Sequence, residues 1–103
     1  MATADESRHD ELLLEGGRVL SDPVRLRILR RLPRTAACAG VLNVSELAKD
    51  LKLPQSTVSR QLAILRRAGF VCSERMCRDV YYWADAKALT SLSAAVRRMA
   101  SAK

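Results

Sequence analysis

The stretch LNVSELAKDLKLPQSTVSRQLAILRRAGF, residues 42 to 70, contains two helix patterns separated by only a few residues. Asn43 is followed three residues later by Glu46, which is the spacing of a capping box at a helix N-terminus. The helix that this pair predicts covers VSELAKDL, residues 44 to 51. A brief turn at Lys52 and Leu53 is expected to separate it from the second pattern.

The second pattern is a longer helix that starts at Pro54, since proline fits the first turn of a helix without needing a donor. Val58, Leu62 and Leu65 recur at spacings of four and three residues, which indicates one buried stripe. Gly69 stands where a helix commonly ends. The stretch as a whole therefore predicts two short helices joined by a tight turn.

The second helix begins with a cluster of short polar side chains that a helix confined to the core does not need. Two short helices joined by a turn of this length describe a helix-turn-helix. In that motif the first residues of the second helix meet base edges in the major groove of DNA, whose width admits an α-helix. The residues of this helix that we predict to contact DNA are Gln55, Ser56, Thr57, Ser59 and Arg60.

Another helix pattern precedes this stretch. Ser21, Asp22 and Pro23 form a helix start, because a Ser or Asp side chain accepts hydrogen bonds from the first backbone N–H groups. The helix that follows has an apolar face and four arginines that we expect to point largely outward, namely Arg25, Arg27, Arg30 and Arg31. Pro33 ends it, and residues 34 to 42 are expected to form a loop.

The N-terminal part of the chain predicts a disordered segment at residues 1–7, because these residues are small, polar or charged. Leucines at residues 12 to 14 indicate a helix over about residues 8 to 20, which Gly16 and Gly17 are expected to weaken or interrupt. A chain of 103 residues has room for one modest core. Residues 8–103 are therefore expected to form a single domain.

The pattern changes after the glycine at position 69. The runs FVCSE and DVYYW are rich in aromatic and β-branched residues and are separated by RMCR, so they predict a β-hairpin. Two strands directly after a recognition helix make a wing, and its basic tip, with Arg75 and Arg78, is predicted to reach phosphates or the adjacent minor groove. Asp85 is expected to cap a last helix.

The charge of the chain is unevenly distributed. Its 18 Lys and Arg residues outnumber its 11 Asp and Glu residues, which gives a net charge of +7. Residues 1 to 22 hold six of the acidic and two of the basic residues, so residues 23 to 103 carry a net charge of +11. This concentration favours a polyanionic partner, nucleic acid before an anionic membrane surface, although a solvated basic surface gives the same count. No membrane span or secretory signal is evident, which predicts a cytoplasmic protein.

Four segments together carry a resemblance to a known family: VLSDPVRLRILRRL, LNVSELAKDL, LPQSTVSRQLAILRRAGFV and DVYY, in this order over about residues 18 to 83. The chain resembles the ArsR-like metalloregulatory winged-helix repressors. The resemblance implies a mainly α fold with one β-hairpin, a winged helix-turn-helix in the order of four helices, two strands and one helix. It also implies a homodimeric transcriptional repressor that binds a palindromic DNA operator and is released when an inducer binds.

The first and last helices carry apolar residues beyond what a core of this size needs. We predict that they pack against a twofold mate and form a dimer interface, while an intrachain helical pair is the alternative. The residues predicted for this interface are Leu12, Leu13, Leu89, Leu92, Val96 and Met99.

The inducer is harder to assign, because the chain departs from the metal sites that the resemblance implies. Family members that bind soft metals have cysteines where this chain has Asn43 and Ser45, and residues 85 to 103 hold no histidine for a second family site. The remaining candidates for binding a soft metal or metalloid, or for a redox reaction, are the thiols of Cys38, Cys72 and Cys77. Cys72 could instead be a small apolar residue on a strand. His9, beside two acidic residues, offers a ligand for a hard metal ion or is simply solvated.

Three functions remain open from the residues. The first is a sequence-specific DNA-binding repressor. The second is a winged-helix module for protein contacts without an operator, and the third is a constitutive regulator without a sensing site. Enzyme function is not expected, because the sequence has no glycine-rich phosphate loop and no nucleophile paired with a base.

Overall fold

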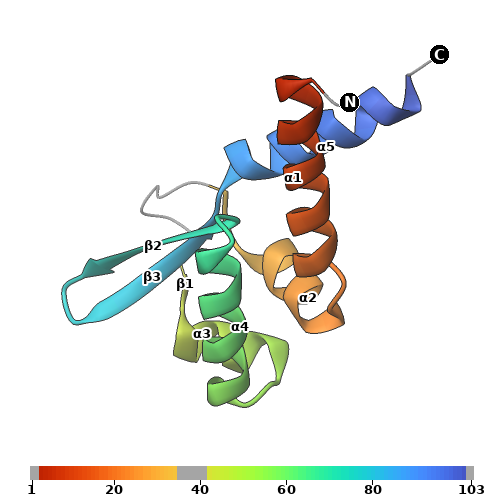
Figure 1. Ribbon diagram of the computed structural model, residues 1–103. Coiled ribbons are helices and arrows are strands. Elements are labelled where there is room, and N and C mark those ends of the chain that lie inside the picture. The colour runs from red at the N-terminus through yellow and green to blue at the C-terminus, as the bar shows by residue number, and fades with distance from the viewer. Residues whose placement is uncertain (1–2, 35–41, 102–103) are drawn as a thin grey trace.

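The computed structural model describes residues 3–34 and 42–101 of the chain. Its elements in chain order are α1 (Ala4–Val19), α2 (Pro23–Arg31), β1 (Leu42–Asn43), α3 (Val44–Leu51), α4 (Gln55–Arg67), β2 (Val71–Met76), β3 (Asp79–Ala84) and α5 (Ala86–Ala100) (Figure 1). The predicted order of four helices, a hairpin and a last helix is confirmed. In the described part of the chain, no helix combines the length and the apolarity needed to cross a membrane.

The strands form one antiparallel sheet in the order β1-β3-β2. In the hairpin, Val71 lies opposite Ala84 and Met76 lies opposite Asp79. The short strand β1 extends the sheet by pairing Leu42 with Tyr82. The expectation of a loop up to residue 42 is therefore wrong at its last residue, because a two-residue strand is too short to produce a pattern in the sequence.

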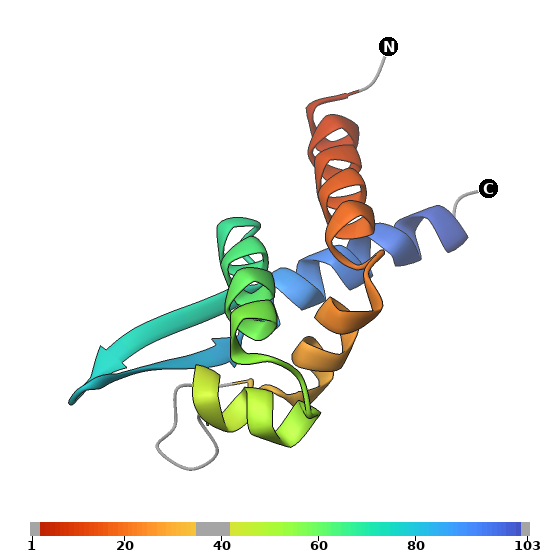
Figure 2. The same ribbon diagram turned by 90° about the horizontal axis from the view of Figure 1, so that it is seen from below.

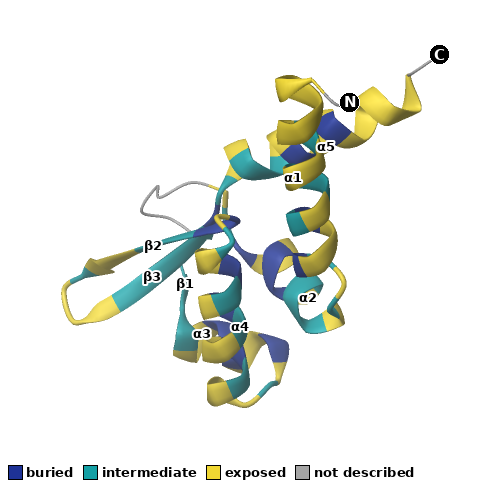
Figure 3. Cartoon of the chain, in the orientation of Figure 1, coloured by how far each residue is buried: buried dark blue, intermediate teal, exposed yellow. Residues whose placement is uncertain are grey.

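The core lies where α2, α3 and α4 pack together against the base of the hairpin, and Figure 3 marks buried residues in dark blue in each of these helices. The stripe predicted for the recognition helix is confirmed, since Val58, Leu62 and Leu65 of α4 are all 0% exposed. Because one side of α4 is used for packing, its opposite side is left to solvent.

The turn between α3 and α4 has a left-handed residue at its start. Asn43 caps α3 as expected, with its side chain accepting from the Glu46 N–H group at 2.8 Å. At the other end of α3, Lys52 has φ 56°, and the next N–H, that of Leu53, donates back to the Ala48 carbonyl at 3.0 Å. This closes the turn within two residues and sets the direction in which α4 begins.

Replacing Lys52 with glycine is expected to raise the free energy of unfolding by about 1 kcal/mol. A residue with a side chain costs about 1–2 kcal/mol in the left-handed region, and glycine removes this cost. Part of the stabilisation is lost again because glycine gives the unfolded chain more conformational entropy. The exposed Lys52 side chain gives up little packing. Urea unfolding monitored by circular dichroism measures the change. The matched control, Lys49→Gly in the interior of α3, should instead lose about 1 kcal/mol; a loss in both variants would contradict the role of the backbone angle.

Gly69 ends α4 as predicted, with φ +88°. The Gly69 N–H donates to the Arg66 carbonyl and the Phe70 N–H to the Leu65 carbonyl, both at 3.0 Å, which is the hydrogen-bond pattern of a Schellman motif. The chain can therefore enter β2 immediately after α4.

Helix α1 begins earlier than expected and runs unbroken through its two glycines. Thr3 and Glu6 form a capping box, so residues 4 to 7, expected to be disordered, belong to the helix. At Gly16, α1 crosses α5 (Figure 2), and a Cβ atom built there would lie only 2.6 Å from a methyl carbon of Leu92. The glycine thus permits a close helix crossing, and the expectation that it weakens or interrupts the helix is wrong.

The expectation for Arg25 is also wrong. It was predicted to point largely outward with the other arginines of α2, but its side chain is only 13% exposed. Its guanidinium group donates to backbone carbonyls at the end of α1 and to the side chain of Gln61 in α4. Hydrophobic periodicity does not reveal such a role, because the acceptors come from other elements.

Candidate nucleic-acid interface

One side of α4 is exposed along its whole length. Successive residues of an α-helix turn by about 100°, so Ser56, Ser59, Arg60 and Ala63 lie together on the side away from the buried stripe, and all four are exposed. Gln55 is exposed as well. Four of the five DNA-contact residues predicted on this helix are therefore accessible from outside.

Two residues of α4 differ from the sequence-based set. Thr57 is half-buried on the flank of the helix rather than at the centre of its exposed side. Ala63 lies near that centre but was not predicted, because an alanine gives no polar signal and only its spacing from Ser59 and Arg60 could have revealed it. Its small side chain leaves room for another surface to approach the helix backbone closely.

The N-terminus of α4 has no side-chain cap. Pro54 occupies the N-cap position, and only its carbonyl takes part, accepting from the Thr57 and Val58 N–H groups at 3.1 and 3.2 Å. The first turn contains no acidic residue. The N–H groups of Gln55 and Ser56 thus stand at the positive end of the helix dipole, which is an arrangement suited to a phosphate.

The hairpin lies beside this helix and shares a hollow with it. Arg75 and Ser73 point to the same face of β2, since side chains alternate along a strand. Both line a hollow of about 410 Å³ together with Ser59 and Arg66 of α4. The fold therefore brings Arg75 close to the helix. It also adds Arg66, which was not among the predicted site residues although it stands in the basic last turn of α4.

The predicted wing tip is formed by Cys77 and Arg78, which connect the paired residues Met76 and Asp79. Arg78 is exposed. Cys77 has φ 58°, in the region that favours glycine. Arg78 lies in this two-residue turn and does not line the hollow that Arg75 lines, so the two arginines do not share that hollow.

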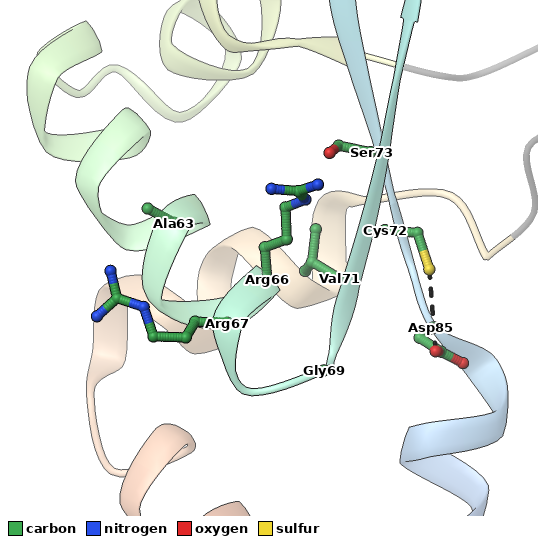
Figure 4. A pocket seen from close by; sticks show the side chains of 8 residues that line it. All are labelled: Ala63, Arg66, Arg67, Gly69, Val71, Cys72, Ser73 and Asp85. Carbon is green, nitrogen blue, oxygen red and sulfur yellow. Dashed lines mark hydrogen bonds between the residues drawn. The ribbon is translucent and has the colours of Figure 1, made fainter.

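A second hollow, of about 620 Å³, follows the end of α4 and the start of β2, with Arg66, Arg67, Cys72, Ser73 and Asp85 among its lining residues (Figure 4). The Cys72 thiol donates to Asp85 Oδ2 at 3.8 Å. Burial, together with the negative charge of Asp85, raises the pKa of the Cys72 thiol. A raised pKa disfavours the thiolate, which is the form that binds metals and reacts with oxidants.

The candidate metal ligands within the described residues lie apart from one another. Cys72 lies near the base of the hairpin, opposite Trp83, whereas Cys77 lies at its tip. Cys38, the third predicted thiol, falls outside the described residues. In the ranges 3–34 and 42–101, no three His, Cys, Asp or Glu side chains gather closely enough to hold a metal ion. His9 contacts the Asp5 carbonyl of its own helix through Nδ1 at 2.6 Å.

The residues predicted for a dimer interface divide into two groups. Leu92 is buried against α1 of its own chain, and Leu13 and Leu89 are half-buried against the core, so part of the set makes the intrachain helical pair that was the alternative. Val96 and Met99 remain 49% and 59% exposed on α5. Leu12 is half-buried in α1. Val96 and Met99 thus form an exposed apolar end of α5. Leu14 of α1 is also exposed, at 70%, although it was not among the predicted residues.

Known proteins share this architecture and parts of this sequence. A family profile described as "Bacterial regulatory protein, arsR family" matches residues 22–73. The "Transcriptional repressor SmtB homolog" of Synechocystis sp. (strain ATCC 27184 / PCC 6803 / Kazusa) is 43% identical over 63 residues, which are 61% of this chain and 44% of that protein. The chain therefore matches less than half of the length of this curated relative.

Two further proteins cover more of the chain. The uncharacterized HTH-type transcriptional regulator Rv0081 of Mycobacterium tuberculosis (strain ATCC 25618 / H37Rv) is 34% identical over 89 residues, 86% of this chain and 75% of that protein. The solved structure of an ArsR-like transcriptional regulator from Rhodococcus sp. RHA1 superposes with a TM-score of 0.75 at 26% identity, over 87% of this chain and 78% of the other. The winged helix-turn-helix fold is thereby confirmed, and the relatives are named as regulators rather than enzymes. The chain belongs to the arsR family of bacterial regulatory proteins.

Proposed function

We propose that the protein is a sequence-specific DNA-binding repressor of transcription that acts as a homodimer. One observation carries the proposal: the exposed side of α4 combines short polar side chains, Arg60, an uncapped N-terminus and the neighbouring Arg75. Short side chains let the helix enter the major groove, and the basic groups meet the phosphates on either side. Since bacterial DNA lies in the cytoplasm, the proposal places the protein there.

The apolar end of α5 supports the homodimer. Val96 and Met99, with Leu14 on α1, are large apolar side chains that a monomer leaves in water. Val96 also lines a hollow of about 460 Å³ with Leu20 and Leu89, which the second copy would cover in the proposed dimer. A twofold dimer built on this surface presents two copies of α4, and such dimers bind half-sites about 34 Å apart.

Changing Val96 to glutamate is expected to convert the dimer into a monomer of 11.4 kDa, because the change buries an unpaired charge in the apolar contact. Analytical ultracentrifugation measures the mass. The control, Ala94→Glu, adds the same charge on another side of α5, where the residue is exposed, and should leave the dimer intact. A dimer of the Val96→Glu variant would move the interface elsewhere.

Changing Arg60 to alanine is expected to weaken binding to the operator by about 1–3 kcal/mol, with little change on random DNA, if the guanidinium group reads a base. Titrations of labelled duplexes measure both affinities. Arg67→Ala is the control, since it removes the same charge from the last turn of the same helix. An equal loss on operator and random DNA would assign Arg60 to phosphate binding instead.

The decisive experiment is selection of bound genomic fragments by the purified chain, followed by footprinting. The proposal expects a protected palindrome, and absence of any protected sequence would favour a module for protein contacts. Release of the operator is then tested with arsenite, cadmium, zinc, nickel and peroxide, on the wild type and on a variant with all three cysteines changed to serine. We propose that any metal or redox inducer acts through these thiols, so release that persists in the variant would exclude that route.

A further inference from the structure

Arg25 joins three helices through one side chain. Its Nε donates to the Val19 carbonyl at 2.7 Å and its Nη2 to the Arg18 carbonyl at 3.3 Å, both in the last turn of α1. Its Nη1 donates to Gln61 Oε1 of α4 at 2.9 Å. The side chain itself starts from α2, and a carboxylate oxygen of Asp22 lies 4.0 Å from Nη1.

The chemistry of these contacts makes them specific for arginine. The carbonyls at a helix C-terminus lack partners within the helix and carry the negative end of its dipole, so a cation is favoured there. The guanidinium group is planar and holds its donors in a fixed fork, which lets it reach the end of α1 and Gln61 at once. Lysine has a single charged nitrogen and cannot reproduce this geometry.

Gln61 is the residue of α4 that accepts the hydrogen bond from Arg25. It is half-buried on the flank of the helix, beside the buried stripe and one turn after Thr57. Apolar packing buries Val58 and Leu62 but is not directional, so it sets the rotation of the helix about its axis less sharply than a hydrogen bond does. A hydrogen bond from the flank to a side chain anchored on two other helices fixes that rotation, and with it the direction of Ser59 and Arg60.

We propose that Arg25 is a positioning residue for the recognition helix and that it couples the orientation of α4 to the end of α1. The inference rests on the proposed DNA-binding function. In a dimer held by α1 and α5, this link transmits the position of the dimer helices to the DNA-reading side chains. Its loss lowers operator affinity more than general affinity for DNA, since base contacts need accurate placement and phosphate contacts do not.

The test uses Gln61→Met, which keeps the length of the side chain and removes its acceptor, and Gln61→Glu, which keeps an acceptor oxygen. We expect Gln61→Met to weaken operator binding about tenfold, as expected for about one lost directional contact, with unchanged affinity for random DNA and an unchanged melting temperature within a few degrees. Gln61→Glu should restore a preference for the operator over random DNA. Equal losses on both DNAs, or no loss at all, would overturn the inference.

Arg25→Met is compared with Arg30→Met, because both remove one positive charge from α2 but Arg30 is exposed. Only the first should reduce the operator preference. Hydrogen exchange without DNA gives an independent readout: in Gln61→Met, amides of α4 should exchange faster while those of α3 do not change. Unchanged exchange in α4 would refute the link even if the wild type binds its operator. If instead the wild type shows no operator preference while α4 exchange responds, the proposed function fails and the mechanical link stands.

Discussion

Raising the salt concentration from about 50 to about 200 mM is expected to weaken operator binding by the dimer about 10³-fold. The physical reason is counterion release, since every phosphate that the protein neutralises frees bound cations from the DNA. Arg75, Arg78 and the uncapped start of α4, each present twice in a dimer, supply about six phosphate contacts. Affinities measured by fluorescence anisotropy over a salt series give the slope of log affinity against log salt concentration.

A variant series makes this result specific. Each arginine that contacts a phosphate contributes about one unit of slope per protomer, so Arg75→Ala should flatten the slope by about two units in the dimer. Glu74→Gln, at the neighbouring exposed position of the same strand, should not flatten it. A titration of the wild type that is flat with salt would argue against DNA as the partner altogether.

Changing Leu62 to alanine is expected to lower the free energy of unfolding by about 2–5 kcal/mol. Leu62 is 0% exposed and belongs to the core cluster that joins α4 to α2 and α3. Removing its isobutyl group leaves a cavity that a tightly packed core fills only in part. Domains of this size have a total stability of about 5–15 kcal/mol, so the variant loses a large share of its folded population on heating.

Chemical denaturation at fixed protein concentration measures this change, because the stability of the proposed dimer would depend on concentration. Ser59→Ala provides the comparison on the same helix, since its side chain is exposed and has no packing to lose. Its effect should stay within about 0.5 kcal/mol, while its operator affinity falls. Equal stability of the two variants would mean that α4 does not hold the domain together as the packing indicates.

Much of the fold could be predicted because its signals are local. The capping box of Asn43, the apolar spacing in α4, Gly69 and the change to β-branched residues all act within a few positions of the chain. The start of α1 also has a local signal, which the prediction missed. Thr3 and Glu6 have the spacing of a capping box, but the polar composition around them favoured disorder. At this helix start the spacing of Thr3 and Glu6 predicts the structure better than the polar composition does.

The errors at Gly16 and Arg25 have a different origin. A glycine inside a helix lowers its propensity, and only the crossing of α5 reveals that the missing side chain makes room for Leu92. An arginine on a helix is usually exposed, and only the arrangement of α1 and α4 reveals acceptors for Arg25. Both features depend on contacts between elements distant in the chain, which no periodic pattern records.

The candidate interface shows the same division. Polar residues at the start of α4 could be named from the sequence, because a recognition helix exposes its first turns. Arg66 could not, since its relevance depends on the hairpin folding back beside α4 to form a shared hollow, and Ala63 has only its spacing from Ser59 and Arg60 to indicate its position. The half-buried position of Thr57 likewise depends on how neighbouring elements pack.

Helix α1 crosses α5 at Gly16, close to the C-terminal end of α1, so a change in the crossing angle moves the N-terminal end of α1 the most. Twelve residues of α1 precede Gly16, which is about 18 Å of helix. A methyl group at position 16 would act as a wedge against Leu92, and a tilt of about 10° would swing the free end by about 3 Å over that length. The absence of a side chain at position 16 therefore sets the angle between α1 and α5, and we expect homologues with a bulkier residue there to hold these two helices at a different angle.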